Sequence, residues 1–498
     1  MKRMCFVVPV FVFCVLFAAP QAAAQMWFTP QGREATGRGL LPYSSAGEAL
    51  AGDVAKSPYI QPLGGTWKMK DVACRDQVAM AMATDEGWQQ VQVSQVWAVN
   101  GKVVLLARSF KRPFVWDDRE IFVRLQGVGA PYEVYVNGKK IGYNPSPMVG
   151  ADFDVTRATT EGNNALVVVL YNDFPAAAAL AAEPQMIVES EAYVFSQPKA
   201  RLRDVDVATS FSTDGGGLLD LGVIIKSHLL NPREIEVFYE LQDAAGVTLA
   251  SGHRTAEFRM KQEDTVRFFA NIPAIKPWSA QHPDLYTLQL KTQFEGRFGE
   301  YVAVPVGFRE VRWERPQRDN PDLGAHRMQA QGGANGKLLV NGAETPLVAT
   351  VVNPFRELAW AETRLKEFKK QGIDMIKLTG PASSAFYSLC DRVGIYVCDQ
   401  AQLSAKVMGA INSANDPYLW PLFEDRIMTM YNASKGHPST LMFSPAEGTA
   451  NGFNLYRAYL ILRQAESTRP VSLAGAGDEW NSDTSADGTL GRLIFRAQ

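Results

Sequence analysis

The side chains that most often carry catalysis are few and widely separated in this sequence. There are five histidines (His228, His253, His282, His326 and His437), and no two of them have the spacing typical of a metal site. His437 precedes Pro438 and is interpreted as part of a structural turn. No Gly-x-Ser-x-Gly turn occurs, so nothing indicates a Ser–His–Asp hydrolase. These residue types predict no metal and no cofactor.

The cysteines likewise suggest packing rather than chemistry. Cys5 and Cys14 lie in the apolar N-terminal segment, which leaves Cys74, Cys390 and Cys398. An odd number without metal-type spacing argues against a disulfide framework or a zinc site. We interpret Cys390 and Cys398 as buried small hydrophobic residues. A disulfide between Cys390 and Cys398, on a helix and the following strand, is the alternative.

The N-terminus has the pattern of a cleavable export signal. Lys2 and Arg3 precede an apolar run at residues 5–19, and alanines at 22–24 precede a cleavage site before Gln25. A membrane anchor is the alternative, but the run is shorter than the roughly 20 residues that a spanning helix needs. No later segment is apolar enough to span. We therefore expect residues 1–24 to be removed and the protein to be periplasmic, associated with the outer membrane or extracellular.

Composition narrows the functional class further. The 498 residues suggest about three domains. Lys and Arg number 50 and Asp and Glu number 52, giving a net charge of −2. Since there is no basic excess, nucleic acid is not an expected partner.

The first two thirds of the chain have the pattern of antiparallel sheets. Residues 25–60 are rich in Gly, Ala, Ser and Pro and are interpreted as a leader or strap. Alternating or apolar runs separated by turns such as Asn137-Gly138 predict a jelly-roll β-sandwich over residues 61–200. A shorter block of the same character predicts an immunoglobulin-like β-sandwich over residues 201–313.

The pattern changes after a polar, Gly-rich linker at residues 314–336. Between residues 337 and 498, apolar runs alternate with amphipathic segments such as AWAETRLKEFKKQG and FNLYRAYLILRQAE. Strand–helix alternation predicts a parallel α/β sheet or barrel. We count at most five strand–helix steps, including a strand at VSLAGAG, whereas a complete eightfold barrel typically takes about 250 residues. We expect an incomplete (β/α) barrel of the TIM type.

Several strings in the same order resemble family 2 glycoside hydrolases, the β-galactosidase and β-glucuronidase group. The resemblance runs from about Trp67 to Val471. It rests on EIFVRLQGVGAPYEVYVNGKKIGY (120–143), ADFDVT (151–156), WSAQHPDLYTLQL (278–290), VGFREVRWE (306–314), FYSLCDRVGIYVCDQA (386–401), GHPSTLMFSPAEGTANGFN (436–454) and TRPV (468–471).

The resemblance implies a retaining glycosidase with an acid/base and a nucleophilic carboxylate about 5 Å apart. The family carries its acid/base in a Trp-Ser-Leu-Gly-Asn-Glu motif on strand four, where this chain has the residues 443–448, FSPAEG. Gly448 then occupies the acid/base position, and Glu447 the position of a sugar-contacting Asn. A shift of one residue turns a strand side chain to the other face. Glu447 is therefore a substitute only if the strand end is bulged.

The nucleophile that the resemblance implies is also missing at the expected place. In the family it is a Glu at the end of strand seven, and only 50 residues follow Gly448 here. Asp478 and Glu479 are weak candidates, since they lie in a Gly-rich loop and are interpreted as solvated loop acids.

Residues that support sugar binding in the family differ as well. Asn353 opens an Asn-Pro-Phe-Arg stretch where the family usually has Asn-Arg-His-Glu. Asp399 and Gln400 begin an Asp-Gln-Ala-Gln stretch where it has Asp-Glu-Ala-Asn. An amide cannot supply the charge that stabilises an oxocarbenium ion. The candidate sugar contacts are Asn353, Asp399, Gln400 and Trp480, the last expected to be the best exposed of the aromatic candidates Trp97, Trp116, Trp360, Trp420 and Trp480.

Three functions follow as hypotheses. The first is a non-catalytic homologue that binds a glycan or serves as a scaffold in the cell envelope. The second is an active exo-glycosidase that uses displaced acids, or whose barrel is completed by another chain. The third is a subunit that binds protein in an outer-membrane transport or secretion complex.

Overall fold

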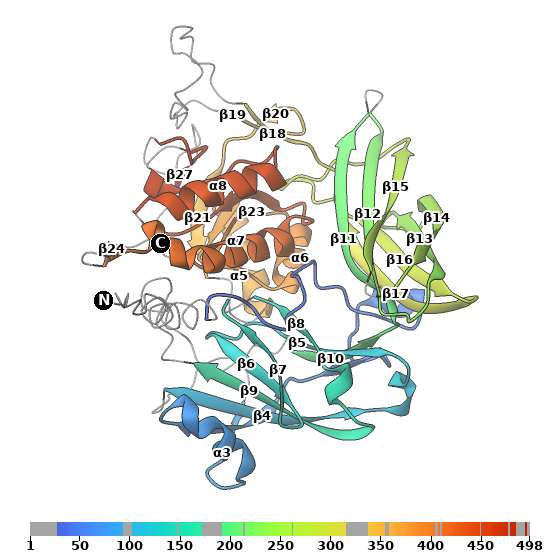
Figure 1. The fold of residues 1–498 in the computed structure, drawn as a ribbon. Helices are drawn as coiled ribbons and strands as arrows, with labels where there is room; N and C mark the ends of the chain where they lie inside the picture. Colours follow the sequence, from blue (N-terminus) through green and yellow to red (C-terminus); the bar gives the residue numbers. More distant parts are fainter. Residues whose placement is uncertain are drawn as a thin grey trace, which may run out of the picture.

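The structure is a computed structural model in which two β-sandwiches and a parallel α/β unit pack around each other (Figure 1). It describes residues 27–92, 102–146, 149–171, 192–212, 215–260, 262–314, 337–353, 358–403, 407–408, 411–448, 450–476, 479–484 and 494–495. The expected signal peptide, most of the expected linker, Trp97, His326 and Asp478 lie outside these ranges.

The first sandwich contains two antiparallel sheets, as the jelly-roll prediction requires. Its core includes Trp67, Trp116 and Tyr132, all buried. The turn at Asn137 and Gly138 has positive φ at both residues, the conformation that a tight hairpin favours. One sheet has the order β1 (Ile60–Pro62), β10 (Tyr193–Gln197), β5 (Glu120–Leu125), β8 (Ala151–Asp154), and the other β3 (Gln89–Gln92), β2 (Thr66–Val72), β4 (Val103–Arg112), β9 (Gly162–Tyr171), β6 (Tyr132–Val136), β7 (Lys139–Asn144).

The second sandwich is the expected immunoglobulin-like unit, with inward-facing residues alternating along its strands. Its sheets have the orders β11 (Ala200–Phe211), β12 (Gly217–Ser227), β15 (Glu263–Ile272) and β14 (Thr248–Phe258), β13 (Arg233–Gln242), β16 (Tyr286–Phe294), β17 (Arg297–Val306).

The third unit holds a parallel sheet with helices, and its barrel is incomplete over the described residues. The sheet order is β26 (Thr440–Ser444), β23 (Tyr396–Gln400), β22 (Met375–Leu378), β21 (Val348–Val352), β27 (Ile494–Phe495). The helices are α5 (Leu358–Lys370), α6 (Ser384–Val393), α7 (Trp420–Ser434) and α8 (Phe453–Ala465). Four further short elements are α2 (Ala46–Ala51), α3 (Val78–Ala83), β24 (Val407–Met408) and β25 (Ile411–Asn412).

Local sequence explains these elements, with two corrections. Ser383 caps α6 by accepting the backbone N–H of Phe386, and Gly394 ends it at φ 74°. The expected strand at VSLAGAG is wrong, because only Val471 pairs, in a single parallel bridge with Phe443. The run LLVNG (338–342) is one of the apolar runs expected to alternate with helices after residue 337. It belongs instead to a separate antiparallel sheet of β18 (Val311–Glu314), β19 (Lys337–Val340) and β20 (Ala343–Glu344).

Residues 27–59 lie across all three units. Gln31 and Tyr43 form bridges with Tyr143 of the first sandwich and Tyr301 of the second. Arg33 donates to Asn144 at 2.7 Å and forms an ion pair with Asp425 of α7. This segment therefore connects the sandwiches to the helices, although the domain boundaries from the sequence stay predictions.

Two further expectations concern the cysteines and the membrane. Cys390 and Cys398 are buried and free, so the packing interpretation is confirmed for both, whereas Cys74 is exposed. Across the described ranges, no helix combines the length and the apolar character needed to cross a membrane.

A buried ion pair connects the end of α8 to the parallel sheet. Glu466 accepts from the Nε of Arg469 at 2.7 Å, and Nη1 of Arg469 lies 3.3 Å from the carbonyl oxygen of Thr440 in β26. Burial alone would raise the pKa of Glu466, but Arg469 and the hydroxyl of Thr468 lower it to about 2. Because the folded pKa is depressed, the pair stabilises the protein above pH 4.5, and this stability is lost as the pH falls towards 2.

We expect Glu466→Gln to lower the free energy of unfolding by about 3 kcal/mol at pH 7, because folding lowers the pKa of Glu466 from 4.5 to about 2. The difference from the unsubstituted protein should vanish near pH 2. Urea unfolding at several pH values measures it. The control is Glu257→Gln, which removes an exposed partner of Arg259 and should cost under about 1 kcal/mol. A cost for Glu466→Gln that is independent of pH would contradict this account.

Candidate functional site

The carboxyl ends of β21, β22, β23 and β26 lie along one edge of the sheet, because these strands pair in parallel. We call this the carboxyl edge. In (β/α) barrels the functional side chains come from the ends of strands at this edge. Most sequence-predicted candidates belong to it: Asn353 follows β21, Asp399 and Gln400 end β23, and Glu447 and Gly448 follow β26.

Asp399 is buried beneath the carboxyl edge. Its Oδ2 accepts the hydroxyl of Tyr387 at 2.8 Å, and its Oδ1 accepts the backbone N–H of Gln400 at 3.0 Å. Burial raises the pKa of Asp399 to about 7, against hydrogen bonds from Ser434, Tyr387 and Gln400 that lower it. Asp399 has no exposed surface, so its carboxylate does not reach solvent. Its hydrogen bonds to Tyr387 and Gln400 stabilise the end of β23.

Gln400 is also buried, with 1% of its surface exposed. Its Oε1 lies 3.5 Å from the hydroxyl of Ser444, the last residue of β26, and that hydroxyl donates to the carbonyl oxygen of Ala446 at 3.1 Å. The last side chain of β23 is therefore a buried, neutral amide that lies next to β26. An amide can accept or donate a hydrogen bond but cannot transfer a proton as a carboxyl group does.

The chain leaves β26 through Glu447 and Gly448. Gly448 has a φ of 114°, a conformation that L side chains rarely adopt. Glu447 is exposed, and its backbone N–H donates to the carbonyl oxygen of Leu403 at 2.8 Å. The register irregularity between β23 and β26 lies at Val397 and Cys398, near the start of the pairing. The printed pairing ends at Ser444, three residues before Glu447, so Glu447 as a substitute acid stays a prediction.

The loop after Val471 places one acid and one aromatic residue beside α8. Glu479 is exposed and accepts a hydrogen bond from the hydroxyl of Tyr456. Trp480 stacks on Tyr456 with ring centroids 5.4 Å apart and meets Tyr459 edge-on at 5.7 Å. Trp480 is therefore half-buried, which corrects the expectation of a well-exposed ring. Its two tyrosine contacts hold it in one orientation.

The other candidates are spread over the molecule. Asn353 is exposed and Trp360, in the first turn of α5, is 53% exposed. Trp420 is buried beneath the guanidinium of Arg457. Trp116 lies in the core of the first sandwich, as its position in the β pattern indicated, and donates to the carbonyl oxygen of Pro58 at 2.8 Å.

The sequence did not indicate a buried polar group beside this loop. Residues 481–484 (Asn-Ser-Asp-Thr) are all buried, although such a run is typical of a solvated loop. The side-chain amides of Asn451 and Asn481 bond to each other in both directions, at 3.0 and 2.9 Å. Asp483 accepts the hydroxyl of Tyr459 and the backbone N–H of Val471, both at 2.9 Å. This polar cluster could not be predicted from the sequence, because it forms only when tertiary packing brings residues 481–484 next to Val471.

The acids near this edge fall into two kinds. Asp399 and Asp483 are buried and accept hydrogen bonds from the protein, whereas Glu447 and Glu479 are exposed. A general acid that works at neutral pH usually lies in an apolar pocket, and neither Glu447 nor Glu479 is enclosed in one. Over the described residues, amides, hydroxyls and one half-buried tryptophan dominate the edge. Such groups bind sugar hydroxyls and ring faces.

Three family descriptions match consecutive parts of the chain. "Glycosyl hydrolases family 2, sugar binding domain" matches residues 78–193, "Glycosyl hydrolases family 2" matches residues 200–309, and "Glycosyl hydrolases family 2, TIM barrel domain" matches residues 368–489.

Individual relatives agree with these matches. A β-galactosidase of Priestia megaterium is 23% identical over 494 residues, which cover 88% of this chain and 46% of the relative. A β-glucuronidase structure from Bacteroides uniformis superposes with a TM-score of 0.71 at 14% identity, covering 83% of this chain and 52% of the other. A β-glycosidase structure from Bacteroides vulgatus gives 0.67 at 18%, covering 83% and 54%. The chain thus spans about half the length of these relatives.

The raised pKa of Asp399 gives a testable pH dependence. Because folding raises this pKa from about 3.9 to about 7, ionising the buried carboxyl destabilises the folded state. Stability should therefore fall as the pH rises from 4 to 7. Asp399→Asn cannot ionise, so its unfolding free energy relative to the unsubstituted protein should increase by up to about 4 kcal/mol across this range. Urea unfolding from pH 4 to 8 measures this difference, and a flat difference would show that Asp399 stays ionised.

Proposed function

Because this chain belongs to glycoside hydrolase family 2, we propose that it binds a glycan at the carboxyl edge of its parallel sheet without hydrolysing it. The observation that carries this proposal is Gly448, which stands at the acid/base position of the family motif with a φ of 114°. Glycine has no proton to donate. The fold of the family is thus combined with a strand end that lacks the group needed for cleavage.

The backbone at Gly448 strengthens this argument. A glutamate held in such a conformation would add strain on the order of 1–3 kcal/mol. The turn after β26 therefore differs from one that presents a glutamate in an ordinary extended conformation.

Other groups support binding. The ring of Trp480 is fixed by Tyr456 and Tyr459, and rigid aromatic faces bind the apolar faces of sugars at low entropic cost. The exposed side chain of Asn353 adds a hydrogen-bonding group at the end of β21. Since the relatives include a β-galactosidase and a β-glucuronidase, we propose galactosyl or glucuronyl glycans as the ligand class.

The alternative function is hydrolysis by displaced acids. It is favoured by the exposure of Glu447 and Glu479, which both lie in loops that follow strand residues pairing in parallel. The apolar run at residues 5–19 motivates the further proposal that the protein acts in the cell envelope, where a protein-binding role would be the third alternative.

We expect no release of nitrophenol from nitrophenyl galactosides, glucuronides or mannosides, and no hydrolysis of the corresponding methyl glycosides. Nitrophenolate leaves without a proton donor, so the nitrophenyl substrates test for a nucleophilic carboxylate, whereas the methyl glycosides need the proton that Gly448 cannot donate. Glu447→Gln and Glu479→Gln should leave this baseline unchanged. Absorbance assays over hours with purified protein measure it. Turnover that Glu447→Gln abolishes would establish the displaced-acid alternative instead.

Glycan binding is tested separately by calorimetry, with ligands selected on a glycan array. Trp480→Ala should weaken binding at least tenfold, because it removes the fixed aromatic face. Phe269→Ala is the matched control, since Phe269 is an aromatic residue with 68% exposure in the second sandwich. Thermal melts of both variants verify folding. Equal affinities for the Trp480→Ala and Phe269→Ala variants would contradict a glycan site at this edge.

A further inference from the structure

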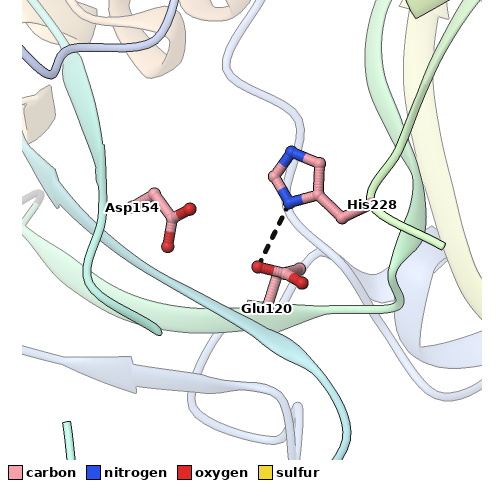
Figure 2. Close-up of side chains that lie close together, drawn as sticks. All are labelled: Glu120, Asp154 and His228. Atoms are coloured by element: carbon pink, nitrogen blue, oxygen red, sulfur yellow. Dashed lines mark ion pairs between the residues drawn. The ribbon is translucent and has the colours of Figure 1, made fainter. Parts of the chain in front are cut away.

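Three side chains that commonly bind metal ions meet where the two sandwiches adjoin (Figure 2). Glu120 is the first residue of β5, Asp154 is the last of β8, and His228 follows the end of β12. One ligand atom from each lies within 4.8 Å of the other two. The carboxyl edge includes none of them, so this cluster is independent of the proposed glycan site.

Both carboxylates are oriented by the same residue. The hydroxyl of Thr156 lies 3.1 Å from Oε2 of Glu120 and 2.6 Å from Oδ1 of Asp154. The backbone N–H of Thr156 also donates to Oδ1 of Asp154 at 2.9 Å. Hydrogen bonds of this kind, made behind the ligands, hold them for a metal and contribute to its affinity. The two carboxylates are therefore positioned before any ion arrives.

The imidazole of His228 comes from the second sandwich, and two contacts position this residue. The backbone N–H of His228 donates to the carbonyl oxygen of Lys199 at 2.6 Å. Its Nδ1 lies 3.2 Å from Oε2 of Glu120, as the dashed line in Figure 2 marks. In tetrahedral zinc sites, metal–ligand distances of about 2.1 Å place two ligand atoms about 3.4 Å apart. This pair already has nearly that separation.

The charges in the cluster suit a divalent cation. Glu120 has only 8% of its surface exposed, and its carboxyl group faces the imidazole of His228. The ammonium of Lys199 is paired with Asp118. Two acidic side chains and one imidazole are the kinds of groups that bind a divalent cation.

The ligand types select among the divalent ions. Zinc accepts His nitrogen together with Asp and Glu oxygens, whereas calcium and magnesium prefer oxygen ligands alone. We propose that Glu120, Asp154 and His228 bind one zinc ion, with solvent completing a tetrahedron, and that this ion links the jelly roll to the immunoglobulin-like sandwich.

The experiment measures zinc binding to the full chain after dialysis against a chelator. Competition with a chromophoric zinc indicator should give one tight site per chain, and ZnCl₂ should raise the thermal midpoint while MgCl₂ and CaCl₂ do not. His228→Ala and the nearly isosteric Asp154→Asn should each weaken zinc binding at least tenfold. They should also remove the zinc-dependent rise in the midpoint.

The control is His253→Ala, which removes an exposed histidine of the same sandwich that stacks on Phe238. It should leave the affinity and the midpoint shift unchanged. If His228→Ala is folded but binds zinc as tightly as the unsubstituted protein, or if the unsubstituted protein has no tight site, the proposal is wrong. Loss of binding in the His253→Ala protein would place the zinc elsewhere. Asp154→Asn keeps the test decisive should His228→Ala fail to fold.

Discussion

At the end of β26, the path of the chain depends on a residue that can adopt a φ of 114°. Glycine meets this requirement without strain, and Gly448 stands at the position where the family motif has its acid/base glutamate. With Gly448 there, the carboxylate next to it in the chain is that of Glu447, which is exposed, whereas Asp399 on the neighbouring strand is buried. Asn353 and Trp480 are available for sugar binding in either case, but the proposal of binding without cleavage depends on this turn.

Arginines of the segment before the first sandwich connect the three units to one another. Arg33 connects the first sandwich to α7, and the backbone N–H of Arg38 donates to the carboxylate of Asp204 in β11 at 2.9 Å. The guanidinium of Arg38 also donates to the carbonyl oxygen of Pro305 in β17 at 2.6 Å. Because Arg38 is buried, leaving these hydrogen bonds unmade would be costly, so its contacts favour this one arrangement of the segment on the second sandwich. The proposed zinc ion would act in the same way at a second junction, between the two sandwiches.

The fold was largely predictable from the sequence because its patterns are local. Alternating runs with turns such as Asn137-Gly138 indicated both sandwiches, and the strings around Tyr396 and Thr440 indicated buried parallel strands. The strand expected at VSLAGAG failed because small residues there form only one bridge, at Val471, before a 3₁₀ turn (Ala474–Ala476). A run of apolar residues does not by itself determine whether a segment pairs as a β-strand.

The sites were less predictable because they depend on contacts between distant residues. The glycine at 448 was visible in the motif, but its backbone conformation was not. Asp399 was expected to touch sugar, yet packing against Tyr387 buries it. The spacing between histidines gave no indication of Glu120, Asp154 and His228, since their separation along the chain carries no metal pattern and only the junction of two sandwiches brings them together.

The most direct measurement is a crystal structure of the protein with an intact glycan bound at the carboxyl edge. The account predicts an unbroken glycosidic bond and no carboxylate within hydrogen-bonding distance, about 3 Å, of the glycosidic oxygen. A carboxylate at that oxygen, with a second one facing the anomeric carbon about 5 Å from the first, would contradict it.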